Sequence, residues 1–302
     1  MSGNPPEYRF RASASSITGE LQRPSKITVP PLEKVELVEN GHICKRLAKC
    51  NRDGLISFEE AYLEAGRSHD DIHDRQTSYA LAVIEGLNVA EMLTADRVVS
   101  RMSVYSPVKD YFGEHTFDIT GSYFENLKIA GYKIDLKLDT YKFHKLNSYS
   151  EFLRSYEEDK KSGKEKKIEN SFLFNELCKL GEADLKELLS QYDALPKAPG
   201  TIEQWRTDTQ KSAEGSYLCS AASHLNLDNC IGQKSELAGY GAVICIPKFG
   251  VIRLAEVEIT RDASRRDTRT LTMFRVDMCS TGHGTTTGGT TEGGPVPPAP
   301  PL

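Results

Sequence analysis

Hydrophobic and polar side chains alternate with a period of two residues toward the end of the first half of the chain. Leucine or isoleucine occupies positions 127, 129, 134, 136 and 138, whereas lysine or aspartate occupies positions 128, 133, 135, 137 and 139. Successive side chains of a β-strand point to opposite faces of the sheet, so this period indicates strands. The pattern predicts an antiparallel surface with one buried and one solvated face, interrupted by a turn or bulge at Ala130–Gly131.

The block from Tyr79 to Asp139 has the same character throughout. Apolar, often β-branched residues lie around Gly86 and around a predicted corner at Thr94–Asp96, which favours short strands. Residues 241–259 predict a hairpin whose two strands flank Pro247–Gly250. Further strands are predicted at Tyr8–Ser15, Leu32–Leu37, Leu55–Ala65 (with a helix as the alternative), Ser216–Ala222 and Thr268–Met278.

The pattern changes to a helical one after residue 147. Ser148 begins a serine–glutamate start signal, and apolar residues follow at 149, 152, 153 and 156. Leucine and phenylalanine recur at helical spacing between Phe172 and Tyr192, after the charged connector Ser162–Lys167. Residues 148–210 are therefore predicted to form a helical insertion.

Together these patterns predict one large, mainly β domain, built as an antiparallel sandwich, a barrel or a solenoid-like stack. Its β-rich parts are residues 1–147 and 211–280, on either side of the insertion at 148–210. Residues 281–302 are rich in glycine, threonine and proline and hold too few apolar side chains to offset the entropy of ordering. They are predicted to be a flexible tail, or a segment that only a partner orders.

Composition narrows the function classes. The chain has 302 residues with 38% hydrophobic and 27% charged side chains, which is typical of a soluble globular protein. A net charge of -5 argues against binding to nucleic acid or to an anionic membrane surface. No run approaches the roughly 20 apolar residues of a membrane span, and the first thirty residues lack an apolar signal-peptide core. The default expectation for location is the cytoplasm.

The seven cysteines are spread along the chain without a Cys-x-x-Cys pair, which argues against a disulfide framework or a structural zinc site. The chain also lacks a Gly-x-Ser-x-Gly nucleophile motif, a phosphate-binding P-loop and a dinucleotide fingerprint, so no nucleotide cofactor is expected. Cys219 and His224 could act as a thiolate and its base only if the fold brings their side chains into contact. The arginines at 261, 265, 266 and 269 suggest a solvated loop or a phosphate site. The lysines of residues 160–167 suggest a solvated helix end or a docking patch.

Residues 49–60 match an EF-hand calcium loop in part. Asn51, Asp53, Gly54, Ile56, Ser57 and Glu60 fall at loop positions 3, 5, 6, 8, 9 and 12. Position 1, however, is Lys49, whose cation would repel calcium instead of binding it. We therefore interpret Asn51–Gly54 as an Asx turn that leads into a strand, with calcium as the alternative.

A second candidate metal site is the segment from His69 to Asp74. On a helix, His69 and His73 would share a face and, with Asp70 and Asp74, could bind a divalent metal ion. The density of aspartates favours a polar loop between strands as the competing interpretation. A metal-dependent hydrolase that uses these four residues is accordingly the second function hypothesis.

Five segments resemble a family of uncharacterised bacterial β-rich proteins, over about two thirds of the chain. They are Val83–Val89, Thr94–Val99, Phe124–Gly131, Phe249–Val257 and Leu271–Arg275. The resemblance implies a β-rich fold and assigns residues 55–66 to a strand, but it carries no catalytic or binding residue.

The function expected first is a non-enzymatic structural, binding or self-assembling role. Exposed strand edges favour pairing with a protein partner or with another copy of the chain, and the tail from residue 281 could serve as a tether or a partner ligand. A membrane-active or pore-forming protein is the third hypothesis, although the strands lack the outward apolar band that lipid contact requires.

Overall fold

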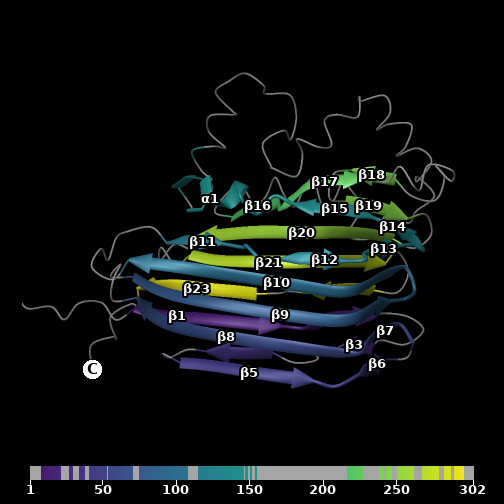
Figure 1. The fold of residues 1–302 in the computed structure, drawn as a ribbon, viewed down its shortest axis with the longest axis horizontal. Helices are drawn as coiled ribbons and strands as arrows, with labels where there is room; N and C mark the ends of the chain where they lie inside the picture. The colour runs from purple at the N-terminus through teal and green to yellow at the C-terminus, as the bar shows by residue number, and fades with distance from the viewer. Residues whose placement is uncertain are drawn as a thin grey trace, which may run out of the picture.

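The structure is a computed structural model that describes part of the chain in segments. These are residues 8–21, 27–29, 34–37, 41–52, 54–70, 75–107, 115–145, 147–148, 150–151, 154, 216–226, 238–240, 243–246, 250–261, 267–278, 282–286 and 289–295. Most of them belong to antiparallel strands, and a short helix, α1 (Lys142–Lys145), lies near the end of the first half of the chain. The prediction of a mainly β fold is confirmed (Figure 1).

The first large sheet, here called sheet I, is formed by the first half of the chain. Its strands are β5 (Gly41–Leu47), β6 (Cys50–Arg52), β7 (Ile56–Phe58), β8 (Glu60–Asp70), β9 (Arg75–Val89), β10 (Leu93–Pro107), β11 (Thr116–Asp118), β12 (Tyr123–Glu125), β13 (Lys128–Ile129) and β14 (Tyr132–Lys133). The long strands lie in the order β5–β8–β9–β10. Ala90 and Glu91 lie in the three-residue turn between β9 and β10, and Ala130–Gly131 form the two-residue turn between β13 and β14; all four have positive φ. The predicted turn at Ala130–Gly131 is therefore confirmed.

The second large sheet, sheet II, combines the two ends of the chain. Its strands are β1 (Tyr8–Ser15), β2 (Ile17–Leu21), β3 (Ile27–Val29), β4 (Lys34–Leu37), β16 (Ser216–Ser220), β18 (Ala238–Tyr240), β19 (Val243–Ile246), β20 (Gly250–Arg261), β21 (Asp267–Met278), β22 (Gly282–Thr286) and β23 (Gly289–Pro295). The predicted hairpin is the antiparallel pair β19–β20, and β21 pairs next to it as expected. A small third sheet pairs β15 (Asp135–Leu138) with β17 (Ala222–Asn226), the strands that follow β14 and β16.

Part of the predicted tail is ordered within sheet II. β22 pairs with β2 and β21, and β23 pairs with β1 and β21. The flexible tail predicted for 281–302 is therefore corrected at residues 282–286 and 289–295. The backbone partners lie within the same chain and on both sides, so these strands form although their side chains are mostly small.

The predicted helical insertion at 148–210 lies almost wholly outside the described residues. At its start Ser150, Glu151 and Arg154 are helical. The Ser148 hydroxyl accepts a hydrogen bond from the backbone N–H of Glu151 at 3.3 Å, as expected of the serine that begins a helix. Within the described residues, no helix combines the length and apolar character needed to cross a bilayer.

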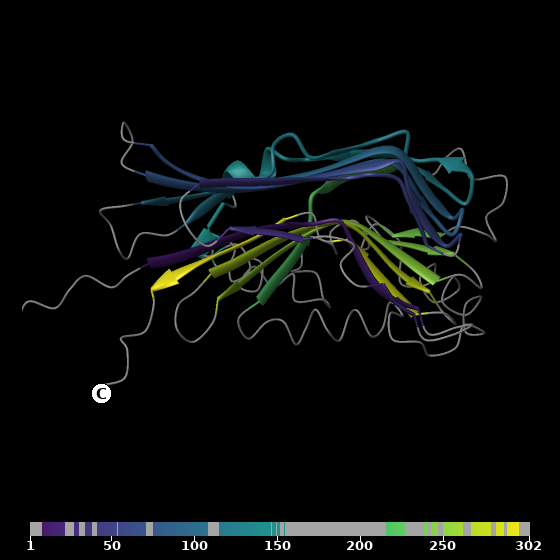
Figure 2. The same ribbon diagram turned by 90° about the horizontal axis from the view of Figure 1, so that it is seen from below.

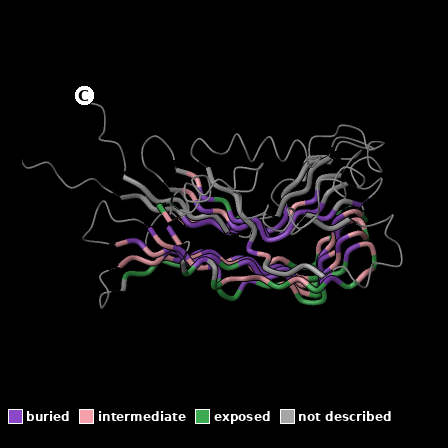
Figure 3. Tube along the Cα trace, turned by 90° about the horizontal axis from the view of Figure 1, so that it is seen from above, coloured by how far each residue is buried: buried purple, intermediate pink, exposed green. Residues whose placement is uncertain are grey.

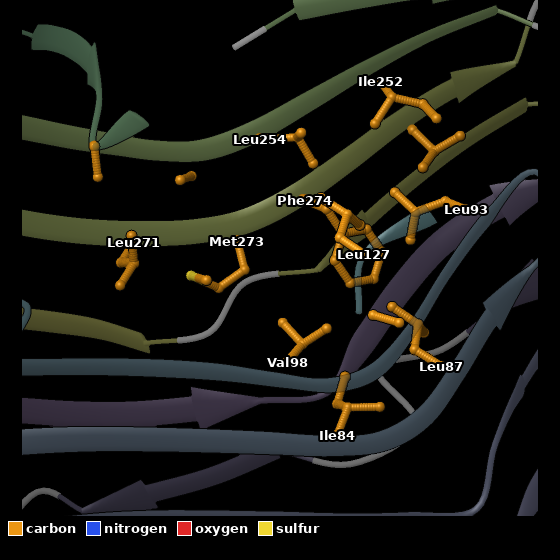
Figure 4. Close-up of a cluster of buried hydrophobic side chains, with 14 of the residues drawn as sticks. Ile84, Leu87, Leu93, Val98, Leu127, Ile252, Leu254, Leu271, Met273 and Phe274 are labelled. Carbon is orange, nitrogen blue, oxygen red and sulfur yellow. The ribbon is translucent and has the colours of Figure 1, made fainter. Parts of the chain in front are cut away.

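The two large sheets face each other as the layers of a sandwich and are not closed into a barrel (Figure 2). β1 and β23 contact β9, and β21 contacts β10, across the space between the sheets. Buried residues run through both layers, and exposed residues lie along the outer face of sheet I (Figure 3). Ile84, Leu87 and Val98 of sheet I share one apolar cluster with Leu254 and Phe274 of sheet II (Figure 4).

The long strands of sheet I bend or end at the same level, and the regular pairing between them is interrupted there. We call this row of residues the bend line. Strand pairing places Lys49 opposite Glu59, Glu59 opposite Gly86, Gly86 opposite Asp96 and Asp96 opposite Asn126. Gly86 and Asn126 have φ values of 63° and 49°. The interruption exchanges the faces of the strand: Ile84 and Leu87 are both buried, although a regular strand would point them to opposite sides.

Sheet II is interrupted in the same way. Ser16 separates β1 from β2, Ala221 separates β16 from β17, and Ala255 with a φ of 53° lies opposite Met273. The Ala221 N–H donates to the carbonyl of Ala255 at 2.8 Å, which keeps Ala221 in line with Ala255. Both layers bend toward the same end of the molecule (Figure 2). The predicted corners at Gly86 and Thr94–Asp96 are therefore bends within long strands, not turns between short ones.

Candidate functional site

The most exposed strand of the described sandwich is β5, which lies at one long edge of sheet I (Figure 1). Among the described residues it pairs only with β8, and six of its seven residues are exposed. Half of the backbone N–H and C=O groups of an edge strand point away from the sheet, where they can pair with another extended chain. The edge of β5 is thus the first component of a candidate binding site.

The edge of β5 is basic in a chain that is acidic overall. The segment Gly41–Arg52 contains four lysine or arginine residues and one histidine but no aspartate or glutamate, whereas the whole chain has a net charge of -5. The carboxylates that face these cations come from β8 and from Glu59, the residue that precedes it. Lys49 Nζ lies 2.8 Å from Glu59 Oε1, and Arg46 Nη1 lies 3.5 Å from Glu60 Oε1.

Next to the basic edge, one carboxylate organises a polar cluster on the outer face of sheet I. Tyr62 Oη donates a hydrogen bond to Glu64 Oε2 at 2.6 Å, and Tyr79 Oη donates to Glu64 Oε1 at 2.8 Å. His42 Nε2 lies 3.0 Å from the same Oε1 atom. Three neighbouring strands, β5, β8 and β9, therefore contribute to one cluster, and cross-strand side-chain pairs of this kind hold strands in register.

The hydrogen bonds of this cluster set the protonation of its members. Burial alone would raise the pKa of Glu64, but the hydrogen bonds from Tyr62 and Tyr79 and the contact with His42 hold that pKa below its usual range. The hydrogen bond to Glu64 raises the pKa of Tyr62 well above that of a free tyrosine. Burial, together with the bond to Glu64, raises the pKa of Tyr79 to about 12. At neutral pH the cluster is an anionic carboxylate held by two neutral phenols, which suits recognition better than nucleophilic chemistry.

Two further contacts fix the tyrosines of the cluster. The guanidinium carbon of Arg46 lies 6.0 Å from the centre of the Tyr62 ring, within the range of a cation–π contact. The Tyr79 ring covers Gly66 on β8, where an added Cβ would lie 2.3 Å from ring atoms. Only glycine leaves room for the ring at that position, and so Gly66 allows Tyr79 to reach Glu64.

We expect Glu64→Gln to make the free energy of unfolding depend less on pH in the acidic range. The pKa of Glu64 is lowered in the folded state, so its contribution is complete above the unfolded pKa of about 4.3 and is lost as pH falls through the folded pKa. The substitution should cost about 1 kcal/mol at pH 7, because it removes hydrogen bonds to a charged group, and progressively less in acid. It should also lower the pKa of Tyr79 toward the ordinary tyrosine value.

The measurements are urea unfolding at a series of pH values and absorbance titration of the tyrosines. Glu125→Gln, at an exposed position of β12, removes one charge of the same sign and is the matched control. If both variants show the same pH dependence of stability, the role given to Glu64 is wrong.

The interpretation of Asn51–Gly54 as an Asx turn that leads into a strand is confirmed. The Gly54 N–H donates to Asn51 Oδ1 at 3.0 Å, Gly54 has a φ of 70°, and Ile56 begins β7. The residues at EF-hand positions 1 and 12, Lys49 and Glu60, instead form ion pairs with Glu59 and Arg46. The segment is thus the turn of the β6–β7 hairpin.

Only half of the predicted metal site at His69, Asp70, His73 and Asp74 can be placed. His69 and Asp70 end β8, where they pair with Gln76 and Arg75 of β9, while His73 and Asp74 lie outside the described residues. His69 is exposed and lies in a strand, not on a helix. In the part of the chain that the structure describes, no three histidine, cysteine, aspartate or glutamate side chains are grouped to bind a metal ion. The metal site remains a prediction.

The other candidate residues fall in separate places. Cys219 lies in β16 of sheet II, and His224 lies in β17 of the small sheet, opposite Lys137. Arg269, predicted in a loop, is instead buried in β21 and donates a hydrogen bond to the carbonyl of His115 at 2.8 Å. Arg261 ends β20, and residues 265 and 266, like the lysine segment 160–167, lie outside the described residues.

The cluster around Glu64 was not predicted from the sequence. Alternation within the predicted strand at Leu55–Ala65 places Tyr62 and Glu64 on one face, and this was the available signal. His42 and Tyr79 join them through strand pairing, because β8 lies between β5 and β9. That pairing does not follow from the pattern of any single strand.

Comparison with known proteins gives a family but no characterised relative. No curated protein and no solved structure matches the chain. The family model described as a domain of unknown function, DUF8256, matches residues 8–260, which include all of sheet I and most of sheet II. Because this match covers most of the chain, the protein belongs to the DUF8256 family.

Proposed function

We propose that this protein is a non-enzymatic binding module that adds an extended segment of another chain to the free edge of β5. The observation that carries the proposal is the exposure of β5 over six of its seven residues, with pairing only to β8 among the described residues. In strand addition of this kind, backbone hydrogen bonds supply the affinity and alternate side chains supply the specificity.

The features by which proteins usually block an edge strand are weak in β5. Short length, proline and bulges prevent edge-to-edge pairing, but β5 has seven residues, no proline and an unbroken register with β8. Charged side chains are another such feature. Here Arg46 and Lys49 contact Glu60 and Glu59, so these side chains are held by neighbouring glutamates and leave the backbone groups of the free edge accessible.

The edge strand of sheet II on the same side of the sandwich is less suited to this role. β4 pairs with β1 over only four residues, Lys34 to Leu37, and its Val35 is buried. A strand of four residues offers about two outward hydrogen-bonding pairs, whereas β5 is nearly twice as long. We therefore assign binding to sheet I.

We expect proline substitutions at Cys44 and Lys45 to have opposite effects. Consecutive N–H groups of a strand point to opposite sides, so one proline removes a donor of the free edge and the other removes a donor that pairs with β8. The proline that removes a donor of the free edge should abolish association and leave the midpoint of unfolding nearly unchanged. The proline that removes a donor to β8 should lower the free energy of unfolding by about 3 kcal/mol.

The measurements are light scattering at increasing protein concentration, recovery of partners from lysate by the wild type and by both variants, and hydrogen exchange of the β5 amides with and without the recovered partner. Slower exchange of the β5 amides in the complex is the expected result. A protein that stays monomeric and recovers no partner, or a stable proline variant that associates like the wild type, would refute the proposal.

A further inference from the structure

We infer that the segment accepted by β5 is acidic, with carboxylates and an aromatic side chain on one face and small or branched apolar side chains on the other. This inference rests on the proposed function and adds the chemical class of the partner. It follows from the two faces of β5, from the strand that β5 already pairs with, and from the charges along the edge.

The outer face of β5 carries His42, Cys44 and Arg46, and β8 shows which side chains satisfy this row. Opposite and diagonal to it lie Glu60, Tyr62 and Glu64 of β8. Glu64 lies 3.0 Å from the His42 ring, Glu60 lies 3.5 Å from Arg46, and the Tyr62 ring lies beside the Arg46 guanidinium. A strand on the free side of β5 would meet the same row at the same spacing of about 4.8 Å, and would gain from the same chemistry.

The inner face of β5 carries Ile43, Lys45 and Leu47, and its apolar part is incompletely covered. Ile43 and Leu47 pair with Ala65 and Ala61 of β8, both of which are fully buried, so Ile43 and Leu47 lie on the face that is turned toward the core. Ile43 nevertheless remains 39% exposed, which is high for a residue on this face. An apolar side chain of an added strand, placed opposite or diagonal to Ile43, would remove that surface from water.

The charge of the edge selects an acidic partner and disfavours a second copy of β5. Gly41–Arg52 contains no carboxylate. If two copies of β5 paired antiparallel about Cys44, His42 of each would lie opposite Arg46 of the other, and Lys45 opposite Ile43. In that pairing the two Lys45 cations would lie at diagonal positions on one face without a carboxylate between them, which is unfavourable, whereas carboxylates of a different segment would be attracted by this edge.

The chain itself supplies a probe with the required pattern. A peptide with the sequence of Glu60–Gly66, Glu-Ala-Tyr-Leu-Glu-Ala-Gly, presents Glu, Tyr and Glu on one face and Ala, Leu and Ala on the other. We would measure its binding to the full-length protein by fluorescence anisotropy, beside two peptides in which both glutamates are replaced by glutamine or by lysine. The acidic peptide should bind at least about tenfold more tightly than the glutamine peptide, an advantage that shrinks in high salt, and the lysine peptide should not bind.

Variants of the protein separate an effect at the edge from an effect of overall charge. Arg46→Glu should remove the preference for the acidic peptide and favour the lysine peptide. Arg101→Glu changes the net charge equally at an exposed position of β10, an interior strand of sheet I, and should leave the preference unchanged. Equal effects of the two substitutions would overturn the inference.

The remaining outcomes separate this inference from the proposed function. If the three peptides bind equally and the edge proline abolishes their binding, strand addition at β5 stands and the acidic preference is wrong. If no peptide binds while the protein associates with itself through β5, the partner is a second copy and the inference is overturned. If no peptide binds and neither proline changes association, the inference and the proposed function both fail.

Discussion

Gly86→Val is expected to lower the free energy of unfolding by about 3 kcal/mol, because valine is poorly tolerated in left-handed backbone and the site is crowded. Gly86 has a φ of 63°, and an added Cβ would lie 2.7 Å from Cγ of Glu59. Moving the Glu59 side chain aside would disturb its ion pair with Lys49. The substitution therefore acts on three adjacent strands along the bend line of sheet I.

The control separates backbone strain from crowding. Gly131 also has a positive φ, 82°, but an added Cβ would meet nothing within 4 Å. Gly131→Val should therefore cost only the backbone strain, about 1.5 kcal/mol. Adding Glu59→Ala to Gly86→Val should recover part of the loss. Equal losses for the two glycine substitutions in guanidinium unfolding would show that the contact with Glu59 has no energetic role.

Phe274→Ala is expected to cost about 4 kcal/mol, the range found when a buried aromatic ring is removed from a core. Phe274 of β21 is 2% exposed and belongs to the cluster that contains Leu254 of its own sheet, Val98 of sheet I, and Leu127 between β12 and β13 (Figure 4). Its ring occupies the space between the sheets, so its loss leaves a cavity that neither sheet can fill without moving. The loss would be measured as a lower midpoint at an unchanged denaturant dependence.

Phe274→Leu is the matched control for this substitution. It keeps most of the apolar volume and should cost about 1 kcal/mol. Tyr123, 39% exposed on β12, provides a second comparison, since Tyr123→Ala removes a ring of similar size from the surface. A loss at Phe274 no larger than the loss at Tyr123 would contradict the placement of the core between the two sheets.

Local patterns in the sequence predicted the strands and several turns of this fold. Alternation predicted Tyr8–Ser15, and the residues flanking Pro247–Gly250 predicted the β19–β20 hairpin, because both signals lie within a few adjacent residues. The Asx turn at Asn51–Gly54 was predictable for the same reason. The choice among sandwich, barrel and stack was not, since it depends on which strands from distant parts of the chain share a sheet.

The candidate site was less accessible to sequence reasoning than the fold. His42 and Glu64 are 22 residues apart, and Tyr79 is 15 residues beyond Glu64, yet their side chains meet because β5, β8 and β9 are neighbours. Residue types alone favoured His69 and His73 as metal ligands, because their spacing matches that of a metal site on a helix. The environment of His69 is instead a strand end, which a motif search cannot detect.

Residues 282–286 and 289–295 show a second limit of composition. Glycine and threonine bury little apolar surface, which is why the segment was expected to stay flexible. Their backbone groups find partners on both sides, in β1, β2 and β21. Threonine is also well suited to strands, because its β-branched side chain fits a pleated surface.

The alignment of the bends across sheet I has a consequence for how this chain can change in length. Lys49, Glu59, Gly86, Asp96 and Asn126 stay opposite one another only while each strand keeps a fixed number of residues between its bend and its end. An insertion of one residue within a strand would put its bend out of step with its neighbours and turn the following side chains to the wrong face. Insertions and deletions should therefore be confined to the connections between strands, such as residues 71–74 and 108–114.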